Sequence, residues 1–443
     1  MSRQMLRSYA ALFLLLAVSL SLPLTSALRA DFVATDPGVR GGPPGAGGPL
    51  PGIGRLDLQL FLAGQSAFQE VDSVQGTIPD TGRGLGPRFN LDSCAGCHSQ
   101  PAPGGSSPPV NPQLAVAAKE GAANVVPPFV ATDGPVLDAF LRFHPDGSRD
   151  GRLLDLFTIA GRTDAPGCDI SQPDLETQLA NDNLGFRMPT PMFGGGLLES
   201  IADETIKENM AAEHGQKQAL GIAGHPNTLP GGAIGRMGWK AEQKGIGLFV
   251  AGAYNAEIGV TSPLFRIEND RDPACHFNKT PEDRFHPGAA TLPEFFPDVV
   301  NFAFFVRFLA PPAPPKLKGA SRRGPELFEK TGCAACHVPR LKTGDSDVKA
   351  LAHREVAAYT DLLLHDMGPT LADICLGLAS PSEFRTEPLM GLRFSEKFLH
   401  DGRAASIEEA IRLHGGEAVS ARDRFDSLPA AEREALLAFL KQL

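Results

Sequence analysis

The sequence predicts a mainly α-helical protein in which two small helical domains are separated by a loop-rich insert. Three observations support this fold class. The motif C-x-x-C-H occurs twice, at 94–98 and at 333–337. Apolar residues recur at helical spacing beside both motifs, whereas the alternating pattern of strands is rare. A Pro-rich run at 310–315 marks a boundary between the halves, because consecutive prolines end a helix and form a stiff linker.

Each C-x-x-C-H motif is typical of a c-type haem attachment site. The two thiols add to the haem vinyl groups, and the adjacent histidine becomes the proximal iron ligand. The predicted cofactors are two covalently bound haem c groups, held by Cys94, Cys97 and His98 and by Cys333, Cys336 and His337. Zinc sites and thioredoxin-like centres also use C-x-x-C. A zinc site requires a second pair of ligands nearby, however, and the two copies lie far apart in the sequence.

The composition is that of a globular, loop-rich protein. Of 443 residues, 48 are Gly and 39 are Pro, and 42% are hydrophobic, which is enough to bury the cores of two or three domains. With 41 basic and 51 acidic side chains, the net charge is −10. This charge argues against nucleic-acid binding and is compatible with a basic or neutral redox partner.

The first residues have the pattern of an export signal. Arg3 and Arg7 precede an apolar run over 9–24, and small residues follow at 25–27. These features predict a signal peptide over 1–30, a periplasmic location and no membrane segment after cleavage. An uncleaved anchor is the alternative, since about 20 apolar residues span a bilayer, but serines and a proline within the run favour cleavage.

The first domain is expected to follow a Gly- and Pro-rich lead-in at 31–55. It begins with an amphipathic segment over 56–71. Further along, 201–220 has the pattern of a helix with a polar face, and 297–309 that of a strongly apolar helix. These features define an N-terminal haem domain, with its insert, over 56–310.

The second domain is expected to follow a linker at 311–317. A helical segment at 324–330 leads into the second C-x-x-C-H motif, and the end of the chain has the pattern of an amphipathic helix with Pro and acidic residues in its first turns. A helix, a haem motif, loops and a terminal helix are the order of elements in a small cytochrome c. We therefore predict a C-terminal cytochrome c domain over 318–443, and two cytochrome c-like haem domains in all.

Three cysteines lie outside the haem motifs. In an oxidising compartment Cys168 and Cys275 could form a disulfide across the inter-haem insert, which would leave Cys375 unpaired. Buried free thiols are the alternative, because disulfide connectivity cannot be deduced from the sequence.

A short internal echo links the two halves. F-R-M-P-T-P-M-F-G at 186–194 is similar to F-R-T-E-P-L-M-G at 384–391, and a glutamate-bearing stretch follows each. The echo indicates two related halves.

Five segments together carry a resemblance to a known family. They are G-L-G-P-R-F-N-L-D-S-C-A-G-C-H at 84–98, G-W-K-A at 238–241, N-A-E-I-G-V-T at 255–261, Y-T-D-L-L-L-H-D-M-G at 359–368, and F-L-H-D-G-R-A with I-E-E-A-I at 398–411. On these segments the chain resembles the di-haem oxidoreductase family, which is related to the bacterial di-haem cytochrome c peroxidases and to MauG.

The resemblance implies two catalytic residues. Di-haem peroxidases carry a tryptophan in a W-D-G-R-A run and, further on, a glutamate in an N-P-x-E-M run; the matching residues here are Trp239 and Glu257. In the family the tryptophan lies between the haems as an electron conduit, and the glutamate stands over the reactive iron and moves protons during O–O cleavage. By residue type alone, Trp239 would be a packing residue and Glu257 a structural hydrogen-bond partner. Glu199 is a rival acid.

The sequence departs from the family at the distal ligand of the second haem. Peroxidases have a methionine and MauG a tyrosine at the position where Ser382 stands. His365, Met367 and His400 are the candidate distal ligands, although His400 beside an aspartate is also typical of a conformational His–Asp pair. No histidine follows His98 where some peroxidases place a distal ligand, so we expect the first iron to be open to a small oxidant.

The function that follows is reduction of peroxide at the first haem with electrons relayed from the second. The expected partners are hydrogen peroxide and a small redox protein, either a cytochrome c or a cupredoxin. One alternative is MauG-like or oxygenase-like oxidation of a protein or organic substrate. Another is a non-catalytic electron-transfer cytochrome. Calcium and a homodimer are further expectations, for which no ligands or contacts can be named.

Overall fold

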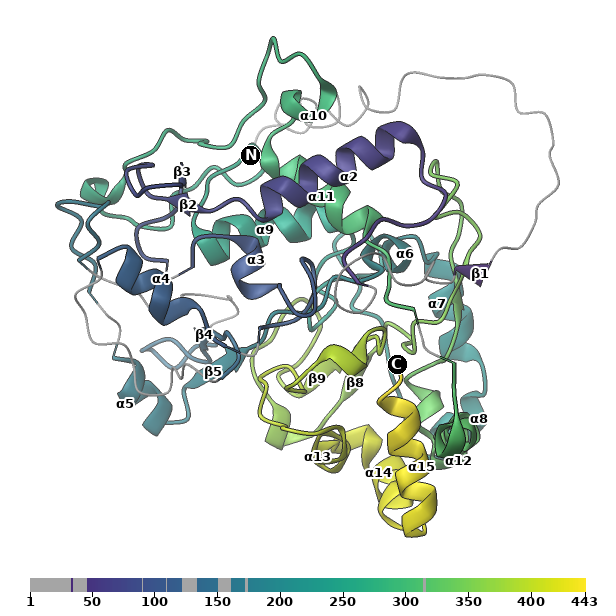
Figure 1. Ribbon diagram of the computed structural model, residues 1–443. Coiled ribbons are helices and arrows are strands. Elements are labelled where there is room, and N and C mark those ends of the chain that lie inside the picture. Colours follow the sequence, from purple (N-terminus) through teal and green to yellow (C-terminus); the bar gives the residue numbers. More distant parts are fainter. Residues whose placement is uncertain are drawn as a thin grey trace. The chain divides into compact units, whose positions relative to one another are not determined.

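The computed structural model describes residues 33–34, 46–89, 91–108, 110–121, 134–149, 161–171, 174–313 and 316–443. The predicted signal peptide at 1–30 lies outside these residues, as do most of the predicted lead-in and two prolines of the predicted linker. The described part of the chain is rich in short helices and has few, short strands (Figure 1), as the sequence predicts. Within it, no helix has both the length and the apolar character needed to cross a membrane.

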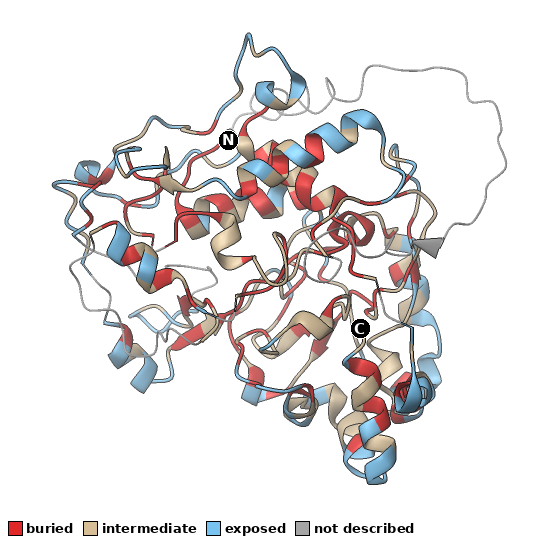
Figure 2. Ribbon diagram, viewed as in Figure 1, coloured by how far each residue is buried: buried red, intermediate tan, exposed pale blue. Residues whose placement is uncertain are grey.

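Three helices form the centre of the first hydrophobic core, namely α2 (Arg55–Phe68), α9 (Ile246–Ile258) and α11 (Asp298–Phe308). The ring of Phe305 lies 5.3 Å from that of Phe61 and 4.9 Å from that of Phe68, a spacing at which aromatic pairs attract each other. Gly64 permits this approach, because a Cβ there would collide with the carbonyl oxygen of Asn301. Figure 2 shows the buried residues along one side of α2. The strongly apolar helix of the sequence prediction is α11.

The other helices of this half are short. They are α3 (Cys94–Cys97), α4 (Gln113–Lys119), α5 (Leu175–Ala180), α6 (Gly195–Glu199), α7 (Asp203–Ala211), α8 (His214–Ala219) and α10 (Leu292–Phe295). The single helix predicted over 201–220 is wrong, because Ala212 is extended and Glu213 is left-handed with φ 53°. Lys217 then folds back and donates to the carbonyl oxygen of Asn209 at 2.7 Å, which fixes the break.

The strands form small pairs. β4 (Asp138–Leu141) pairs antiparallel with β5 (Leu184–Arg187), and β8 (Leu364–Asp366) pairs antiparallel with β9 (Glu383–Arg385). The two copies of the internal echo begin in β5 and β9, so they occupy the same position in two similar pairs. The remaining strands are β1 (Val33–Ala34), β2 (Asp72–Ser73), β3 (Gly82–Arg83), β6 (Leu341–Lys342) and β7 (Glu355–Val356), in the orders β1–β7–β6 and β2–β3.

A second hydrophobic core lies at the C-terminal end. It is built by α12 (Gly324–Thr331), α13 (Ile407–Leu413), α14 (Val419–Asp426) and α15 (Ala430–Leu440). The ring of Phe328 on α12 lies 5.9 Å from that of Phe439 on α15, and Gly324 allows the contact because a Cβ there would collide with Phe439. The second C-x-x-C-H motif follows α12 directly in the 3-10 helix η4 (Cys333–Ala335). The other 3-10 helices are η2 (Pro273–Cys275), η3 (Gly319–Arg323), η5 (Pro369–Leu371), η6 (Leu392–Phe394) and η7 (Gly416–Ala418).

The first core extends past the predicted linker at 311–317. Leu341, Leu351, Val356 and Leu362 are buried in it, together with the residues of α2, α9 and α11. Residues Val33–Leu443 accordingly form one compact unit. The segment between the second haem motif and β8 therefore contributes to the first core as well as to the C-terminal half.

The predicted disulfide between Cys168 and Cys275 is present, with an S–S distance of 2.03 Å. Cys375 is a free, half-buried thiol, as expected. The four cysteines of the C-x-x-C-H motifs are free as well.

Candidate functional site

The first C-x-x-C-H motif forms a single helical turn. Ser93 caps α3 by accepting a hydrogen bond from the N–H of Gly96 at 3.1 Å, a standard N-cap interaction. His98 follows the turn and is buried. Its Nδ1 lies 3.1 Å from the carbonyl oxygen of Gly105. When Nδ1–H donates to this carbonyl, Nε2 carries the lone pair that a metal requires.

The second motif repeats this design. Nδ1 of His337 lies 3.0 Å from the carbonyl oxygen of Tyr359. Burial lowers the pKa of His98 to about 4, although hydrogen bonds with the backbone of Gly105 and Thr190 act in the opposite direction. Burial also lowers the pKa of His337 to about 4, with a further contribution from His414. Both imidazoles are thus neutral at physiological pH, which is the state that binds a metal.

Each motif borders a cavity. The first cavity, of about 90 Å³, is lined by Cys94, Cys97 and His98 and by apolar side chains that include Phe68 and Phe249. The second, of about 250 Å³, is lined by the second motif and by further apolar side chains, among them Leu371, Leu389, Phe398, Ile407 and Leu440. Two free thiols and a neutral, oriented imidazole against an apolar cavity fit a covalently attached haem at both places.

Trp239 lies in the wall between the two cavities. It lines both of them, together with Met188 and Pro189. Its indole Nε1 donates to the carbonyl oxygen of Met188 at 3.0 Å, and its carbonyl oxygen accepts from the N–H of Arg385 at 2.9 Å. The ring also meets the ring of His400 edge-on at 6.4 Å. Trp239 thus lines both of the cavities that border the motifs, and its role as an electron conduit stays a prediction.

Glu257 borders the first cavity from the last turn of α9. Burial, and after it the charge of the nearby Asp138, raises the pKa of its carboxyl group to about 8. The rival acid Glu199 borders neither cavity. It accepts hydrogen bonds from the N–H of Ile246 and from Nε of Arg307, both at 2.9 Å, so it caps α9 and ties it to α11. Of the two glutamates, only Glu257 therefore borders a cavity next to a C-x-x-C-H motif.

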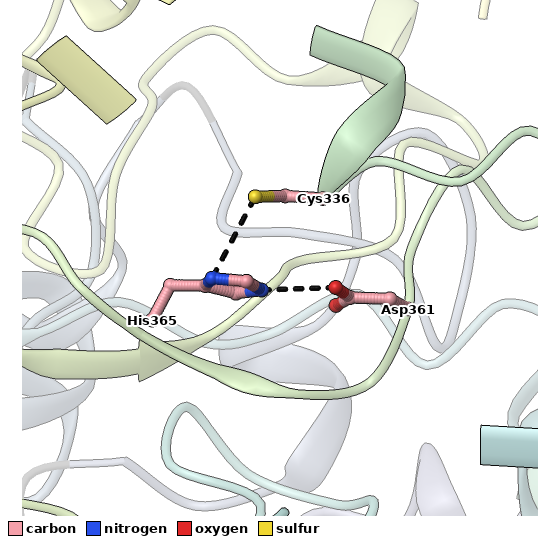
Figure 3. A group of neighbouring side chains, drawn as sticks. All are labelled: Cys336, Asp361 and His365. Carbon is pink, nitrogen blue, oxygen red and sulfur yellow. Dashed lines mark hydrogen bonds and ion pairs between the residues drawn. The ribbon is translucent and has the colours of Figure 1, made fainter. Parts of the chain in front are cut away.

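His365 is held between two carboxylates and is buried. Its Nε2 lies 2.9 Å from Oδ2 of Asp361, and its Nδ1 lies 2.7 Å from Oε2 of Glu417. Figure 3 shows the ring between Asp361 and Sγ of Cys336, which lies 3.6 Å from Nδ1. Burial acts to lower the pKa of His365, but the charge of Asp361 and its hydrogen bond outweigh burial and hold the pKa well above its usual value. Both ring nitrogens are therefore protonated and engaged, which leaves no lone pair for iron.

The atoms of Cys336, Asp361 and His365 that could bind a metal come within 4.8 Å of one another. Because Cys336 belongs to a haem motif and His365 carries two protons, this group fits an ion-paired clamp beside the second haem site better than a separate metal centre. Among the described residues no other group of three such side chains is as close. The expected calcium ion remains a prediction.

His400 and Met367 both line the second cavity. The ring of His400 is stacked on Phe384 at 4.3 Å, and burial lowers the pKa of His400 to about 4. Its Nε2 lies 4.0 Å from Oδ2 of Asp401, which is longer than a hydrogen bond. Asp401 instead pairs with Arg403 at 2.5 Å. His400 and Asp401 therefore do not form a hydrogen-bonded pair. The ring nitrogens of His400 are not bound by this aspartate.

His414 is a site residue that the sequence prediction missed. It lines the second cavity just after α13. Its Nδ1 lies 2.6 Å from the carbonyl oxygen of Ala410, which is the arrangement found at both proximal histidines. Burial lowers the pKa of His414. The ring is therefore neutral, and its Nε2 is available as a ligand. The one sequence signal for His414 was that it is one of the five histidines in residues 318–443.

Asp138 and Arg187 were also missed. Both line the first cavity, and their Cα atoms are partners in the β4–β5 pair. Nε and Nη2 of Arg187 donate to Oδ2 of Asp373 at 3.0 and 2.6 Å, and Asp373 also binds Nζ of Lys240 at 2.8 Å. Arg187 and Lys240 fall within quoted segments of the sequence, but Asp138 and Asp373 belong to no motif, so the group as a whole could not be read from the sequence.

A model of the protein family described as "Di-haem oxidoreductase, putative peroxidase" matches residues 143–443. This range includes the second C-x-x-C-H motif, Trp239 and Glu257, whereas the first motif precedes it. The match covers more than half of the chain, which is enough to assign the chain to this family. No curated protein matches the chain.

Two solved structures are similar to parts or all of the chain. Hydrazine synthase of Kuenenia stuttgartiensis is 16% identical, with a TM-score of 0.36, over 96% of this chain and 99% of that one. A MauG-like protein associated with microbial copper homeostasis is 21% identical, with a TM-score of 0.23, over 33% of this chain and 52% of that one. At these TM-scores neither likeness extends to the geometry of the site.

Proposed function

The chain belongs to the di-haem oxidoreductase family, and on this premise we propose that it reduces hydrogen peroxide at a first haem c with electrons supplied through a second. The observation that carries the proposal is the asymmetry of the two cavities. A carboxyl group with a raised pKa borders the first cavity, and a wall containing Trp239 separates it from the second.

The cofactor sites follow from the two motifs. Cys94 and Cys97 would hold the first haem and Cys333 and Cys336 the second, with His98 and His337 as proximal ligands. A haem held at the first site would supply the redox chemistry of peroxide cleavage. The hydrogen bonds from Nδ1 to the carbonyl oxygens of Gly105 and Tyr359 fix the tautomer and orientation of both imidazoles.

Glu257 would serve as the proton-transfer group of the first cavity. Because its pKa is raised to about 8, the carboxyl group is protonated at neutral pH and can give its proton to a peroxide oxygen. The apolar rings of Phe68 and Phe249 line the same cavity, so few polar side chains compete with a bound oxidant for this proton.

Trp239 would pass electrons between the two haems. Its indole is held by the carbonyl of Met188 and its backbone by Arg385, so the ring cannot turn away from either cavity. A fixed π-system in the shared wall shortens the gap that an electron must cross.

The second haem would take a further iron ligand from a residue that lines its cavity. His414, His400 and Met367 all line this cavity. His414 is the strongest of the three, since its Nδ1 is already bound to a backbone carbonyl. His365 would act as a fixed positive charge beside this haem.

Export, partners and assembly complete the proposal. The signal-like residues at 1–30 support a periplasmic enzyme, and the Cys168–Cys275 disulfide is compatible with an oxidising compartment. A small cytochrome c or cupredoxin would donate the electrons. A homodimer with bound calcium is proposed from the family resemblance alone.

One observation favours a second candidate function. Ser382, at the position of the peroxidases' methionine ligand, is absent from the residues that line the second cavity. The second haem would thus differ electronically from that of the peroxidases, as it does in MauG-like enzymes that oxidise a protein or organic substrate.

Peroxide turnover tests the proposal. The purified holoprotein is mixed with a reduced cytochrome c and hydrogen peroxide, and donor oxidation is followed. We expect turnover in the wild type, a loss on the order of 100-fold or more in Glu257→Gln, and little change in Glu176→Gln, which alters an exposed acid on α5. Failure of the wild-type holoprotein to oxidise any reduced donor with peroxide would overturn the peroxidase assignment.

A further inference from the structure

We propose that Asp138 is a second catalytic acid of the first cavity and that it acts with Glu257 as a pair delivering both protons that peroxide reduction consumes. This inference rests on the proposed function and deepens it. Asp138 precedes the residues matched by the family and belongs to none of the sequence motifs.

The β4–β5 pair places Asp138 at the cavity. Asp138 is the first residue of β4, and its register partner is Arg187 at the end of β5. Phe140 sets this register, because it lies opposite Gly185, where a Cβ would collide with the Phe140 ring. A slip by one residue would turn Asp138 to the other face. The carboxyl group is therefore held at the cavity by strand packing.

Glu257 reaches the same cavity from a different element, the last turn of α9. The two carboxyl groups thus border one small cavity from two different elements, β4 and α9. They are close enough for the charge of Asp138 to raise the pKa of Glu257. Two like charges in a small apolar cavity repel strongly, so at least one of the groups keeps its proton.

Arg187 does not hold Asp138 in the ionised state. Its Nε and Nη2 are committed to Asp373, and its Nη1 has no hydrogen-bond partner among the described residues. Burial raises the pKa of Asp138 to about 7, and the partly shared charge of Arg187 opposes this only in part. Asp138 and Glu257 accordingly both exchange protons near neutral pH.

The other titratable groups around this cavity do not compete. Glu242 is engaged by the N–H of Lys240 at 3.0 Å, and the pKa of Tyr254 is raised well above its usual value by burial. The two thiols would be consumed by haem attachment. The full set of titratable and charged side chains lining the cavity beside the pair is Cys94, Cys97, His98, Arg187, Glu242 and Tyr254.

The pair matches the stoichiometry of the reaction. Hydrogen peroxide, two protons and two electrons give two molecules of water. As the O–O bond breaks, Glu257 gives its proton to one oxygen and Asp138 gives its proton to the other, while the electrons arrive through Trp239 from the external donor. Solvent then reprotonates both carboxylates. A single acid would have to be reprotonated by solvent between the two proton transfers of one turnover.

Infrared spectroscopy of the ferric holoprotein tests the pair independently of turnover. The carbonyl stretch of protonated carboxyl groups is followed as a function of pH in the wild type, Asp138→Asn, Glu257→Gln and the control Glu176→Gln. We expect two bands that disappear near neutral to mildly alkaline pH, the loss of one band in each cavity variant, and no change in the control. In Asp138→Glu the missing band should return, which separates the chemical role from a structural one.

Turnover provides the second measurement. Asp138→Asn should lower the rate of peroxide reduction on the order of 10- to 100-fold and shift its pH profile, with haem content unchanged and partial recovery in Asp138→Glu. If Asp138→Asn leaves the infrared bands and the pH profile as in the wild type, the pair does not exist. If the bands behave as expected but the wild type does not turn over peroxide, the pair stands and the peroxidase assignment fails.

Discussion

The indole Nε1 of Trp239 donates a 3.0 Å hydrogen bond to the carbonyl oxygen of Met188, and both residues line the two cavities that border the haem motifs. Because the acceptor is a backbone atom, the bond survives any change of the Met188 side chain. The ring is thus fixed in the shared wall by the fold itself.

Replacement of Trp239 by Phe should slow electron transfer between the haems by more than an order of magnitude, because the smaller ring also lacks the N–H that anchors it. Stopped-flow absorption of the reduced holoprotein after mixing with peroxide gives this rate. Phe295→Leu, an exposed aromatic on α10 that borders neither cavity, is the control. Equal rates in Trp239→Phe and the wild type would exclude the relay.

Replacement of His414 by Ala should convert the second haem from low spin to high spin, since Nε2 of His414 would no longer be available to the iron. Electron paramagnetic resonance of the ferric holoprotein measures the spin state. His365→Gln should leave the second haem low-spin, because both nitrogens of His365 are bound to Asp361 and Glu417. The opposite pattern would assign the ligand to His365, and a change in His400→Ala alone would assign it to His400.

His365→Gln should nevertheless destabilise the fold. The substitution leaves the buried carboxylate of Asp361 without its charged partner, a loss of about 3 kcal/mol or more. Since the pKa of His365 is raised above its unfolded value, its contribution is full below pH 6.5 and is lost as the pH rises through the folded pKa. Urea unfolding at two pH values measures this loss. His225→Gln, which breaks a half-exposed pair with Glu383, should cost less than about 1 kcal/mol.

Three aspartates beside the first core should make stability fall at rising pH. Burial raises the pKa of Asp72 to about 8, that of Asp283 to about 7 and that of Asp298 to about 6. Because these groups bind protons more tightly folded than unfolded, their contribution is present below about pH 4 and is lost between about pH 4 and 8. Asp72→Asn should flatten the profile of melting temperature against pH over this range. An unchanged slope would show that Asp72 is ionised in the folded protein.

Local patterns in the sequence predicted α11 and α15, because each depends on short spacing alone. The disulfide joins Cys168 and Cys275 across 107 residues, so the sequence could offer it only as one of two possibilities. The helix at 201–220 failed, since the turn at Glu213 is fixed by Lys217 folding back to Asn209, a contact that helical periodicity does not contain.

The partners within the site could not be predicted, because they are brought together by tertiary structure. His365 is paired with Glu417, which lies on a distant 3-10 helix. Glu257 feels the charge of Asp138, which lies on a strand in the other half of the insert. Both neighbours change the chemistry of the residue that the sequence singled out. His365 becomes a fixed cation instead of a ligand, and Glu257 becomes one member of a carboxyl pair.

The reaction of the fully reduced holoprotein with one equivalent of hydrogen peroxide tests most directly whether the first haem reacts and the second supplies electrons. In the wild type both haems should become ferric together, each giving one of the two electrons. In Cys94→Ala/Cys97→Ala, which lacks the first attachment site, the second haem should stay ferrous. Oxidation of the second haem at the wild-type rate in that variant, or a wild type that stays reduced, would contradict the assignment.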